Sequence, residues 1–206
     1  MLAKIDPART KVHRKGSFSG KSVLYWMSRD KRVDDNWALL AAQSVALNNK
    51  VPLIVCFQYL GHFPEANIRQ YGFLLKGLLE LKNKLEGLNI EFILSQGRAS
   101  EVIPRIIDDK LVGTIITDYS PLRVYKKRVS KVLNQTKVPF YQIDAHNIVP
   151  VWKASSKKEY AAYTIRKKIH NNLDQFLTDY PSLVKHPYGN IRKNDISYDN
   201  LSLIHI

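Results

Sequence analysis

Side chains that could hold a flat ligand follow two apolar runs of the sequence. They are Trp26, Met27, Ser28 and Arg29 at the end of the first run, and Asp118, Tyr119 and Ser120 at the end of a later one. Open parallel sheets bind ligands at the carboxyl ends of their strands, where two such loops meet at a reversal of strand order. The alternative for the later loop is structural, because Asp118 can act as a cap and Pro121 can begin a helix.

Hydrolytic chemistry does not fit these residues. Asp118, Ser120 and His146 supply the residue types of a catalytic triad. A nucleophile elbow, however, needs glycines on both sides of its serine, and Tyr119 and Pro121 stand there instead. We therefore interpret these side chains as polar groups that satisfy the backbone at strand ends.

Phosphate-loop and metal chemistry are also disfavoured. Residues 16–22 resemble a phosphate-binding loop, but one residue is missing between the glycines, and the segment precedes a strand instead of joining strand to helix. The six histidines lack metal-ligand spacing. The single cysteine, Cys56, lies in an apolar run, where the simplest interpretation is a small core residue.

Five apolar runs alternate with helical patterns along the chain. The runs are residues 22–27, 52–57, 90–94, 112–118 and 138–144. We expect the first helix to begin at Asp34 and Asp35. Further helices are expected between Pro64 and Gly87, near residues 99–110 and near residues 122–134. Continuous apolar strands that alternate with helices predict an α/β fold, a doubly wound five-stranded parallel sheet covered on both faces.

A basic segment follows the fifth run. After Trp152 we expect one long helix with an apolar stripe at spacings of four and three, formed by Ala161, Ile165, Ile169, Leu173 and Phe176. Such a stripe needs an apolar partner surface. Past Pro181 the sequence is polar and irregular, which is typical of a connector.

Composition narrows the class of protein. A chain of 206 residues with 45% hydrophobic content can bury one sizeable core, and its net charge of +14 favours polyanions such as nucleic acid. The basic run at residues 123–131 fits a phosphate contact or, more simply, a solvated helix face. A single cysteine excludes an internal disulfide and fits a reducing compartment. The sequence shows no signal peptide and no membrane helix, so we expect a cytoplasmic protein. We also expect it to be a monomer.

Four ordered segments resemble class II DNA photolyases, light-driven enzymes that split cyclobutane pyrimidine dimers. They begin with YWMSRD at residues 25–30, continue with ANIRQYGFLLKGL at 66–78 and TDYSPLR at 117–123, and end with DAHNIVPVWKAS at 144–155, with similarity on to residue 169. Tyr163 departs from the family, in which Arg is usual at this position.

The resemblance implies the amino-terminal α/β antenna domain of such an enzyme. The family's reaction belongs to a following helical domain, which binds FAD, receives the flipped-out dimer of UV-damaged DNA and transfers an electron to it from excited reduced flavin. No catalytic residue is therefore expected in this chain. We expect the apolar stripe of the basic helix to pack against that missing flavin domain.

The resemblance also implies a light-harvesting pigment, a deazaflavin where one is present. The residues expected to surround it are Trp26, Met27, Ser28, Arg29, Cys56, Phe57, Lys76, Asp118, Tyr119 and Ser120. Apolar walls and a few polar anchors suffice for such a site.

We divide the chain into four parts. Residues 1–20 are an amino-terminal extension, 21–152 the α/β domain, 153–200 a connector helix and linker, and 201–206 a tail. The tail, LSLIHI, is the translation of a transposon end used to build sequencing libraries, so we expect it to be non-native.

Two other functions share this pattern. A cryptochrome-like photoreceptor carries the same α/β domain, and a free-standing pigment-binding or nucleotide-binding module is the other possibility. A free-standing module would have to cover its own apolar stripe.

Overall fold

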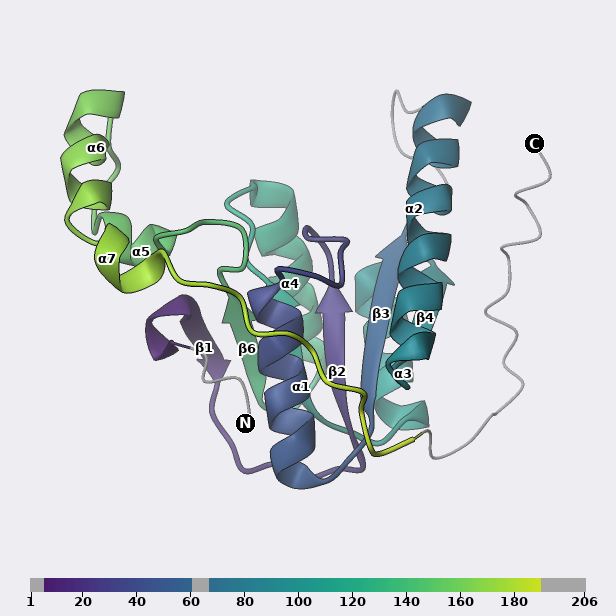
Figure 1. Cartoon of the computed structure of the whole chain (residues 1–206). Helices are drawn as coiled ribbons and strands as arrows, with labels where there is room; N and C mark the ends of the chain where they lie inside the picture. The colour runs from purple at the N-terminus through teal and green to yellow at the C-terminus, as the bar shows by residue number, and fades with distance from the viewer. Residues whose placement is uncertain (1–5, 61–66, 190–206) are drawn as a thin grey trace.

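A twisted sheet forms the centre of the computed structural model, which describes residues 6–60 and 67–189 (Figure 1). Within those residues the sheet has six strands in the order β1-β6-β5-β2-β3-β4. Their bounds are β1 Thr10–Arg14, β2 Ser22–Met27, β3 Leu53–Tyr59, β4 Glu91–Gln96, β5 Val112–Asp118 and β6 Phe140–Ile143. Strands β2 to β6 pair in parallel, and β1 runs antiparallel to β6.

The strand order reverses at β2, as predicted. This strand pairs with β3 on one side and with β5 on the other, so the first and fourth predicted strands are neighbours. The doubly wound α/β fold is confirmed, but the count of five strands is wrong. Strand β1 lies in the predicted amino-terminal extension. The sequence pattern does not predict it, because it is short, polar and only half-buried and has no apolar run.

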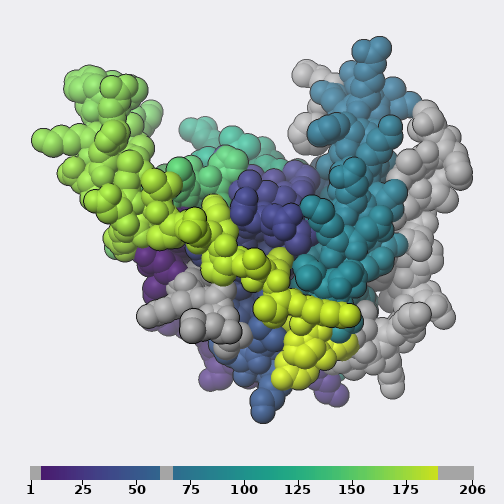
Figure 2. Space-filling model, in the orientation of Figure 1, coloured from purple at the N-terminus to yellow at the C-terminus, as the bar shows by residue number. Residues whose placement is uncertain are grey.

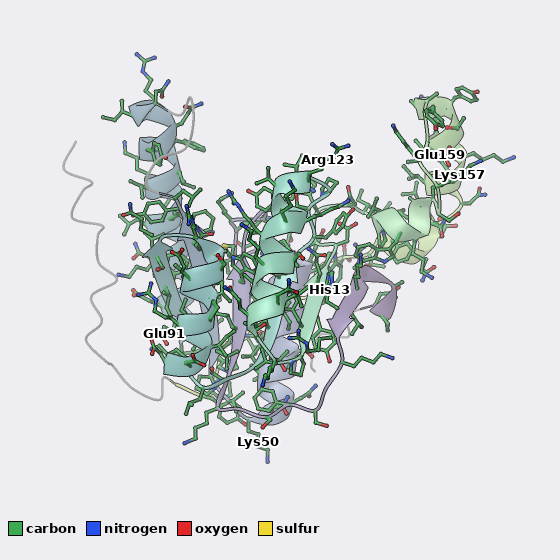
Figure 3. The ribbon with its side chains drawn as sticks, turned by 180° about the vertical axis from the view of Figure 1, so that it is seen from behind. His13, Lys50, Glu91, Arg123, Lys157 and Glu159 are labelled. Carbon is green, nitrogen blue, oxygen red and sulfur yellow. The ribbon has the colours of Figure 1, made fainter. Side chains whose placement is uncertain are left out.

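Helices cover both faces of the sheet. One face carries α1, Trp37–Asn49, and α2, Ile68–Gly87. The other carries α3, Ala99–Asp109, and α4, Arg123–Gln135, which faces the viewer in Figure 3. Alternate side chains of each central strand serve the two layers, which explains why these strands are apolar throughout.

The start of α1 differs from the prediction. Asn36, and not Asp34 or Asp35, is the cap, and its Oδ1 accepts hydrogen bonds of 3.0 Å from the backbone N–H groups of Ala38 and Leu39. The fully buried Asn36 also donates through Nδ2 to backbone carbonyls of the preceding loop. An amide serves as acceptor and donor at once, which an ionised carboxylate cannot do.

The prediction of one long basic helix after Trp152 is wrong. The segment forms three short helices, α5 Val151–Ala154, α6 Ala162–His170 and α7 Leu173–Phe176. A short 3-10 helix near the amino terminus, η1 Pro7–Arg9, packs its Ala8 against the cluster that they form. Phe176 is buried with residues of α5 and the preceding loop, and Ile169 and Leu173 pack on this cluster. The carboxyl-terminal half of the predicted stripe is therefore covered by the chain itself.

The buried guanidinium of Arg9 holds this region to the sheet. It donates to the carbonyl oxygens of Asn147 at 2.8 Å, Ile148 at 2.6 Å and Phe176 at 3.2 Å. A charged donor that satisfies several carbonyls is worth more than a neutral one.

Residues 177–189, called the strap below, lie along α1 (Figure 1). The side chain of Gln43 donates to the carbonyl of Val184 at 2.7 Å and accepts from its N–H at 3.1 Å. His186 donates its backbone N–H to Leu88 and its ring Nε2 is 2.8 Å from the carbonyl of Val51. The first part of the predicted linker is thus docked on the α/β domain.

Helix α6 and the amino-terminal part of α2 project past the carboxyl ends of the strands, with a hollow surface between them (Figure 2). Among the described residues no helix has the length and apolarity needed to cross a membrane. Three predicted parts lie outside the described residues. They are the tail 201–206, residues 190–200 of the linker and residue 66 of the second family segment.

Candidate functional site

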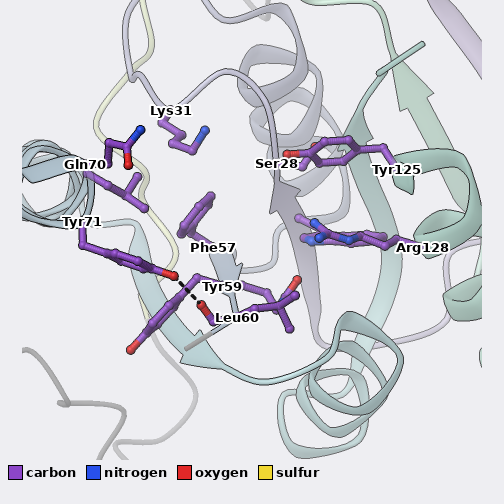
Figure 4. A pocket seen from close by; sticks show the side chains of 12 residues that line it. Ser28, Lys31, Phe57, Tyr59, Leu60, Gln70, Tyr71, Tyr125 and Arg128 are labelled. Carbon is purple, nitrogen blue, oxygen red and sulfur yellow. Dashed lines mark hydrogen bonds between the residues drawn. The ribbon is translucent and has the colours of Figure 1, made fainter. Parts of the chain in front are cut away.

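A pocket of about 240 Å³ opens at the carboxyl ends of β2 and β3, between α2 and α4 (Figure 4). Its lining residues are Trp26, Ser28, Lys31, Phe57, Gln58, Tyr59, Leu60, Gln70, Tyr71, Leu74, Tyr125 and Arg128. This is the edge of the sheet at which open α/β folds bind ligands.

Flat and apolar side chains form most of the wall. Trp26 and Phe57 come from the strand ends, and Tyr71 and Leu74 lie one helical turn apart on α2. The Tyr71 hydroxyl donates to the carbonyl of Leu60 at 3.5 Å, which joins α2 to the loop after β3 (Figure 4). Aromatic faces spaced in this way suit a planar, conjugated ligand.

A few polar groups are set into these walls. The Lys31 ammonium lies 5.4 Å from the Phe57 ring centre, and the Arg128 guanidinium lies 5.1 Å from that of Tyr125. Partial desolvation lowers the pKa of Lys31, although its side chain keeps contact with water. Such groups could fix the orientation of a ligand by hydrogen bonds or cation–π contacts.

A buried polar hub centred on Asp118 lies beside the pocket. The carboxylate is 2% exposed, and its Oδ1 accepts a 2.5 Å hydrogen bond from the Tyr25 hydroxyl. Its Oδ2 accepts from the backbone N–H groups of Ser28 and Arg29, both at 2.8 Å. Asn36 Nδ2 donates to the Tyr25 oxygen at 3.1 Å, so the hub ties β5, β2 and the start of α1 together.

The hydrogen bonds of the hub satisfy the buried groups that form it, and the pKa directions agree with this arrangement. Burial raises the pKa of Asp118, and the donors from Tyr25, Ser28 and Arg29 oppose that rise. Burial and the neighbouring carboxylate push the pKa of Tyr25 well above its ordinary value, so its hydroxyl remains a donor. The hub fixes the loop after β2 and thereby places Ser28 and Lys31 at the mouth of the pocket.

Three of the ten residues predicted to surround a pigment line the pocket, namely Trp26, Ser28 and Phe57. Met27 and Cys56 are fully buried in the two core layers, because neighbouring residues of a strand point to opposite faces. Burial also raises the pKa of the Cys56 thiol, as fits the core residue it was taken to be.

The other predicted residues surround the pocket without lining it. Arg29 and Asp118 belong to the hub. The Tyr119 ring packs edge-on against Trp152 at 5.2 Å, and Ser120 Oγ accepts from the N–H of Leu122 at 3.4 Å. Lys76 is exposed on α2 outside the pocket lining.

The sequence reasoning missed nine lining residues: Lys31, Gln58, Tyr59, Leu60, Gln70, Tyr71, Leu74, Tyr125 and Arg128. A signal for some of them was available. Tyr125 and Arg128 are three apart on a helix that begins at the same sheet edge, and Tyr71 and Leu74 repeat this spacing on α2.

The predicted absence of a triad agrees with the geometry. His146 Nδ1 lies 3.1 Å from Asp30 Oδ1, and the Asp118 carboxylate is occupied by the hub. Across residues 6–60 and 67–189 no three His, Cys, Asp or Glu side chains are grouped to hold a metal ion.

The fold is a doubly wound α/β domain with a pocket at the carboxyl edge of its sheet, beside the reversal of strand order. A family model described as DNA photolyase matches residues 23–186, and the chain belongs to this family. The prediction of the family is confirmed, and assignment to its class II stays a prediction.

Curated relatives agree with the family. The chain is 46% identical over 182 residues to the deoxyribodipyrimidine photo-lyase of Potorous tridactylus, covering 87% of this chain and 34% of the relative. It is 38% identical over 207 residues to that of Arabidopsis thaliana, covering 96% of this chain and 42% of the relative. The chain therefore spans about a third to two fifths of these proteins.

Solved structures share the fold. A Synechocystis sp. PCC6803 cryptochrome matches with a TM-score of 0.60 and 15% identity, over 82% of this chain and 36% of that one. A bacterial class III photolyase from Agrobacterium tumefaciens matches with a TM-score of 0.56 and 20% identity, over 85% of this chain and 38% of that one.

Proposed function

We propose that this chain is the light-harvesting part of a DNA-repair lyase that splits cyclobutane pyrimidine dimers. In the whole protein, FAD bound in a domain beyond this chain supplies the electron that cleaves the dimer. Membership of the DNA photolyase family and relatives named deoxyribodipyrimidine photo-lyase support the proposal. UV-damaged DNA is accordingly the proposed partner of the whole protein.

The pocket at the carboxyl ends of β2 and β3 carries the proposal for this chain. Its aromatic walls would enclose the rings of a deazaflavin, and its polar groups would orient them. An antenna need only be held rigidly and kept from water, so the task of Trp26, Phe57, Tyr71 and Leu74 is packing.

A fluorescence titration with 5-deazariboflavin tests the pocket. Trp26 lines it, so binding should quench tryptophan emission. Leu74→Arg places a charge in the apolar wall and should weaken binding at least about tenfold. Leu79→Arg is the matched control, because Leu79 is exposed on the same helix and outside the lining. Equal affinity in the two variants would contradict the site.

The action spectrum of the whole protein separates an antenna from a structural pocket. In the protein that includes the flavin domain, Leu74→Arg should reduce dimer repair only at wavelengths that the deazaflavin absorbs. Repair driven by light that the flavin absorbs directly should be unchanged. An equal loss at both wavelengths would show that the pocket supports the fold and not light harvesting.

Repair is favoured over photoreception by the relatives. Those named photo-lyase are 34% to 46% identical to this chain, whereas a cryptochrome DASH of Arabidopsis thaliana is 26% identical. Light-dependent removal of dimers from damaged DNA by the whole protein is the deciding assay. Light absorption without any loss of dimers would favour the photoreceptor.

The exposed face of α6 is the proposed contact with the flavin domain. Tyr163 is 77% exposed there, and Tyr160 just before the helix is 89% exposed. Tyr163→Ser should leave the stability of this chain unchanged but weaken its binding to a separately supplied flavin domain. Unaltered binding would move the contact elsewhere.

A further inference from the structure

A second cavity, of about 180 Å³, adjoins the pocket on the side of α3 and α4. Gln58, Leu60 and Arg128 line both spaces, so the two lie next to each other and are separated by no more than these side chains. Arg98 and Lys131 line only the second cavity. A ligand whose rings fill the first space could therefore extend a side chain into the second.

Three of the residues that line the second cavity carry a positive charge. Arg128 and Lys131 lie one turn apart on α4, and Arg98 immediately precedes α3. The described lining includes no carboxylate. Glu101 approaches Arg98 at 3.8 Å, but both side chains are highly exposed, so this pair neutralises little of the charge.

Further donors point to the same ligand chemistry. Helix α3 begins at this cavity without a side-chain cap, and Ser100 in its first turn lines the space. Free N–H groups at a helix start add to the attraction of the three cations for an anion. Guanidinium and ammonium groups around a small cavity are the arrangement that proteins use for phosphate monoesters.

We propose that the second cavity binds a phosphate monoester at the end of the pigment's side chain. The inference rests on the proposed antenna function and refines it: the preferred pigment is the phosphorylated form of the tricycle, not the neutral one. A row of nucleic-acid phosphates fits less well, because the cationic groups line a single small space that is shared with the aromatic pocket.

Paired ligands test this directly, with the 206-residue chain titrated by 5-deazariboflavin and by its 5′-phosphate. The phosphate ester should bind roughly 10- to 100-fold more tightly, the range expected for hydrogen bonds to a charged group. Arg98→Gln combined with Lys131→Gln should remove most of that difference and leave the affinity for 5-deazariboflavin unchanged. Lys127→Gln is the control, because Lys127 is an exposed cation on α4 that lines neither cavity.

The outcomes separate this inference from the proposed function. Equal binding of the two ligands to the unaltered chain would overturn the phosphate site and leave the antenna pocket standing. Binding of neither would overturn both. Inorganic phosphate and a short single-stranded oligonucleotide serve as competitors. Displacement of the phosphate ester by either, at a concentration similar to its own, would assign the cavity to free phosphate or nucleic acid and overturn the proposal.

Discussion

The pocket and the hub lie side by side at the reversal of strand order, yet they are opposite in chemistry. The hub consists of polar groups that satisfy one another around Asp118, with almost no contact with water. The pocket consists of aromatic and apolar walls with a few polar groups set among them. Asp118, which the sequence presents as a candidate ligand-binding residue, stabilises the fold. Residues with no evident chemical role in the sequence, such as Tyr71 and Leu74, line the pocket.

The largest expected effect is on the hub. Asp118→Ala leaves the Tyr25 hydroxyl and the N–H groups of Ser28 and Arg29 without their acceptor, so the free energy of unfolding should fall by roughly 3–5 kcal/mol. Urea denaturation measures this. Asp118→Asn keeps one acceptor oxygen and should cost less. A loss below about 1 kcal/mol for Asp118→Ala would show that the hub is not a principal anchor.

In the pocket we expect a substitution to weaken ligand binding more than it lowers the free energy of unfolding. Tyr71→Ala removes an aromatic wall and should weaken binding of 5-deazariboflavin by about tenfold. Stability should change by less than in the Asp118 variants, because Tyr71 is only half-buried. Phe73→Ala is the control, since Phe73 is 84% exposed on the same helix. Similar affinities for the two variants would remove the distinction between pocket and surface.

Docking of the strap is expected to depend on pH in mild acid. Burial lowers the pKa of His186, and its buried ring Nδ1 has no hydrogen-bond partner among the described residues. The neutral ring therefore stabilises docking above the ordinary histidine pKa of 6.5, and this stabilisation is lost as the pH falls through the lowered pKa.

Hydrogen exchange at residues 183–188, compared at pH 7.5 and 5.5 after correction for intrinsic rates, measures the release. Protection should drop at the lower pH in the unaltered chain. His186→Gln retains a donor for the carbonyl of Val51 and should abolish the pH dependence. A dependence that persists in this variant would assign it to another group.

The smallest expected effect concerns the turn before α6. The Lys168 ammonium donates a 2.5 Å hydrogen bond to the Glu159 carboxylate. This hydrogen bond is the main reason why the pKa of Glu159 falls from 4.5 to about 2. The interaction stabilises the turn above about pH 4.5 and is lost as the pH falls through about 2. Amide exchange in α6 should accelerate over that interval, and Glu159→Gln should show the faster exchange already at neutral pH.

The fold was largely predictable, because apolar runs of β2 to β6 and the helical spacing of α2 are imposed by burial on both faces of the sheet. Strand β1 was not, since a polar edge strand is selected by pairing with β6 and by tertiary contacts such as those of Arg14 with the carbonyls of Leu133 and Thr136.

The edge of the sheet was predictable, but the exact place and the composition of the site were not. Strand order predicted a ligand between the loops after β2 and β5, whereas the pocket opens at the ends of β2 and β3, where Trp26 and Phe57 line it. The contributions of Tyr71 and Tyr125 depend on how far α2 and α4 stand from the sheet, a distance that no local pattern encodes. Met27 faces the same core layer as its register partner Phe57, but it is fully buried there and does not reach the pocket.

Hydrogen exchange of the whole chain with and without saturating 5-deazariboflavin tests the central claim most directly. The account predicts added protection at residues 57–60, 70–74 and 125–128, which surround the pocket, and little change across 143–154. Protection confined to another surface, or no change at the pocket despite binding, would contradict the claim that this pocket holds the pigment.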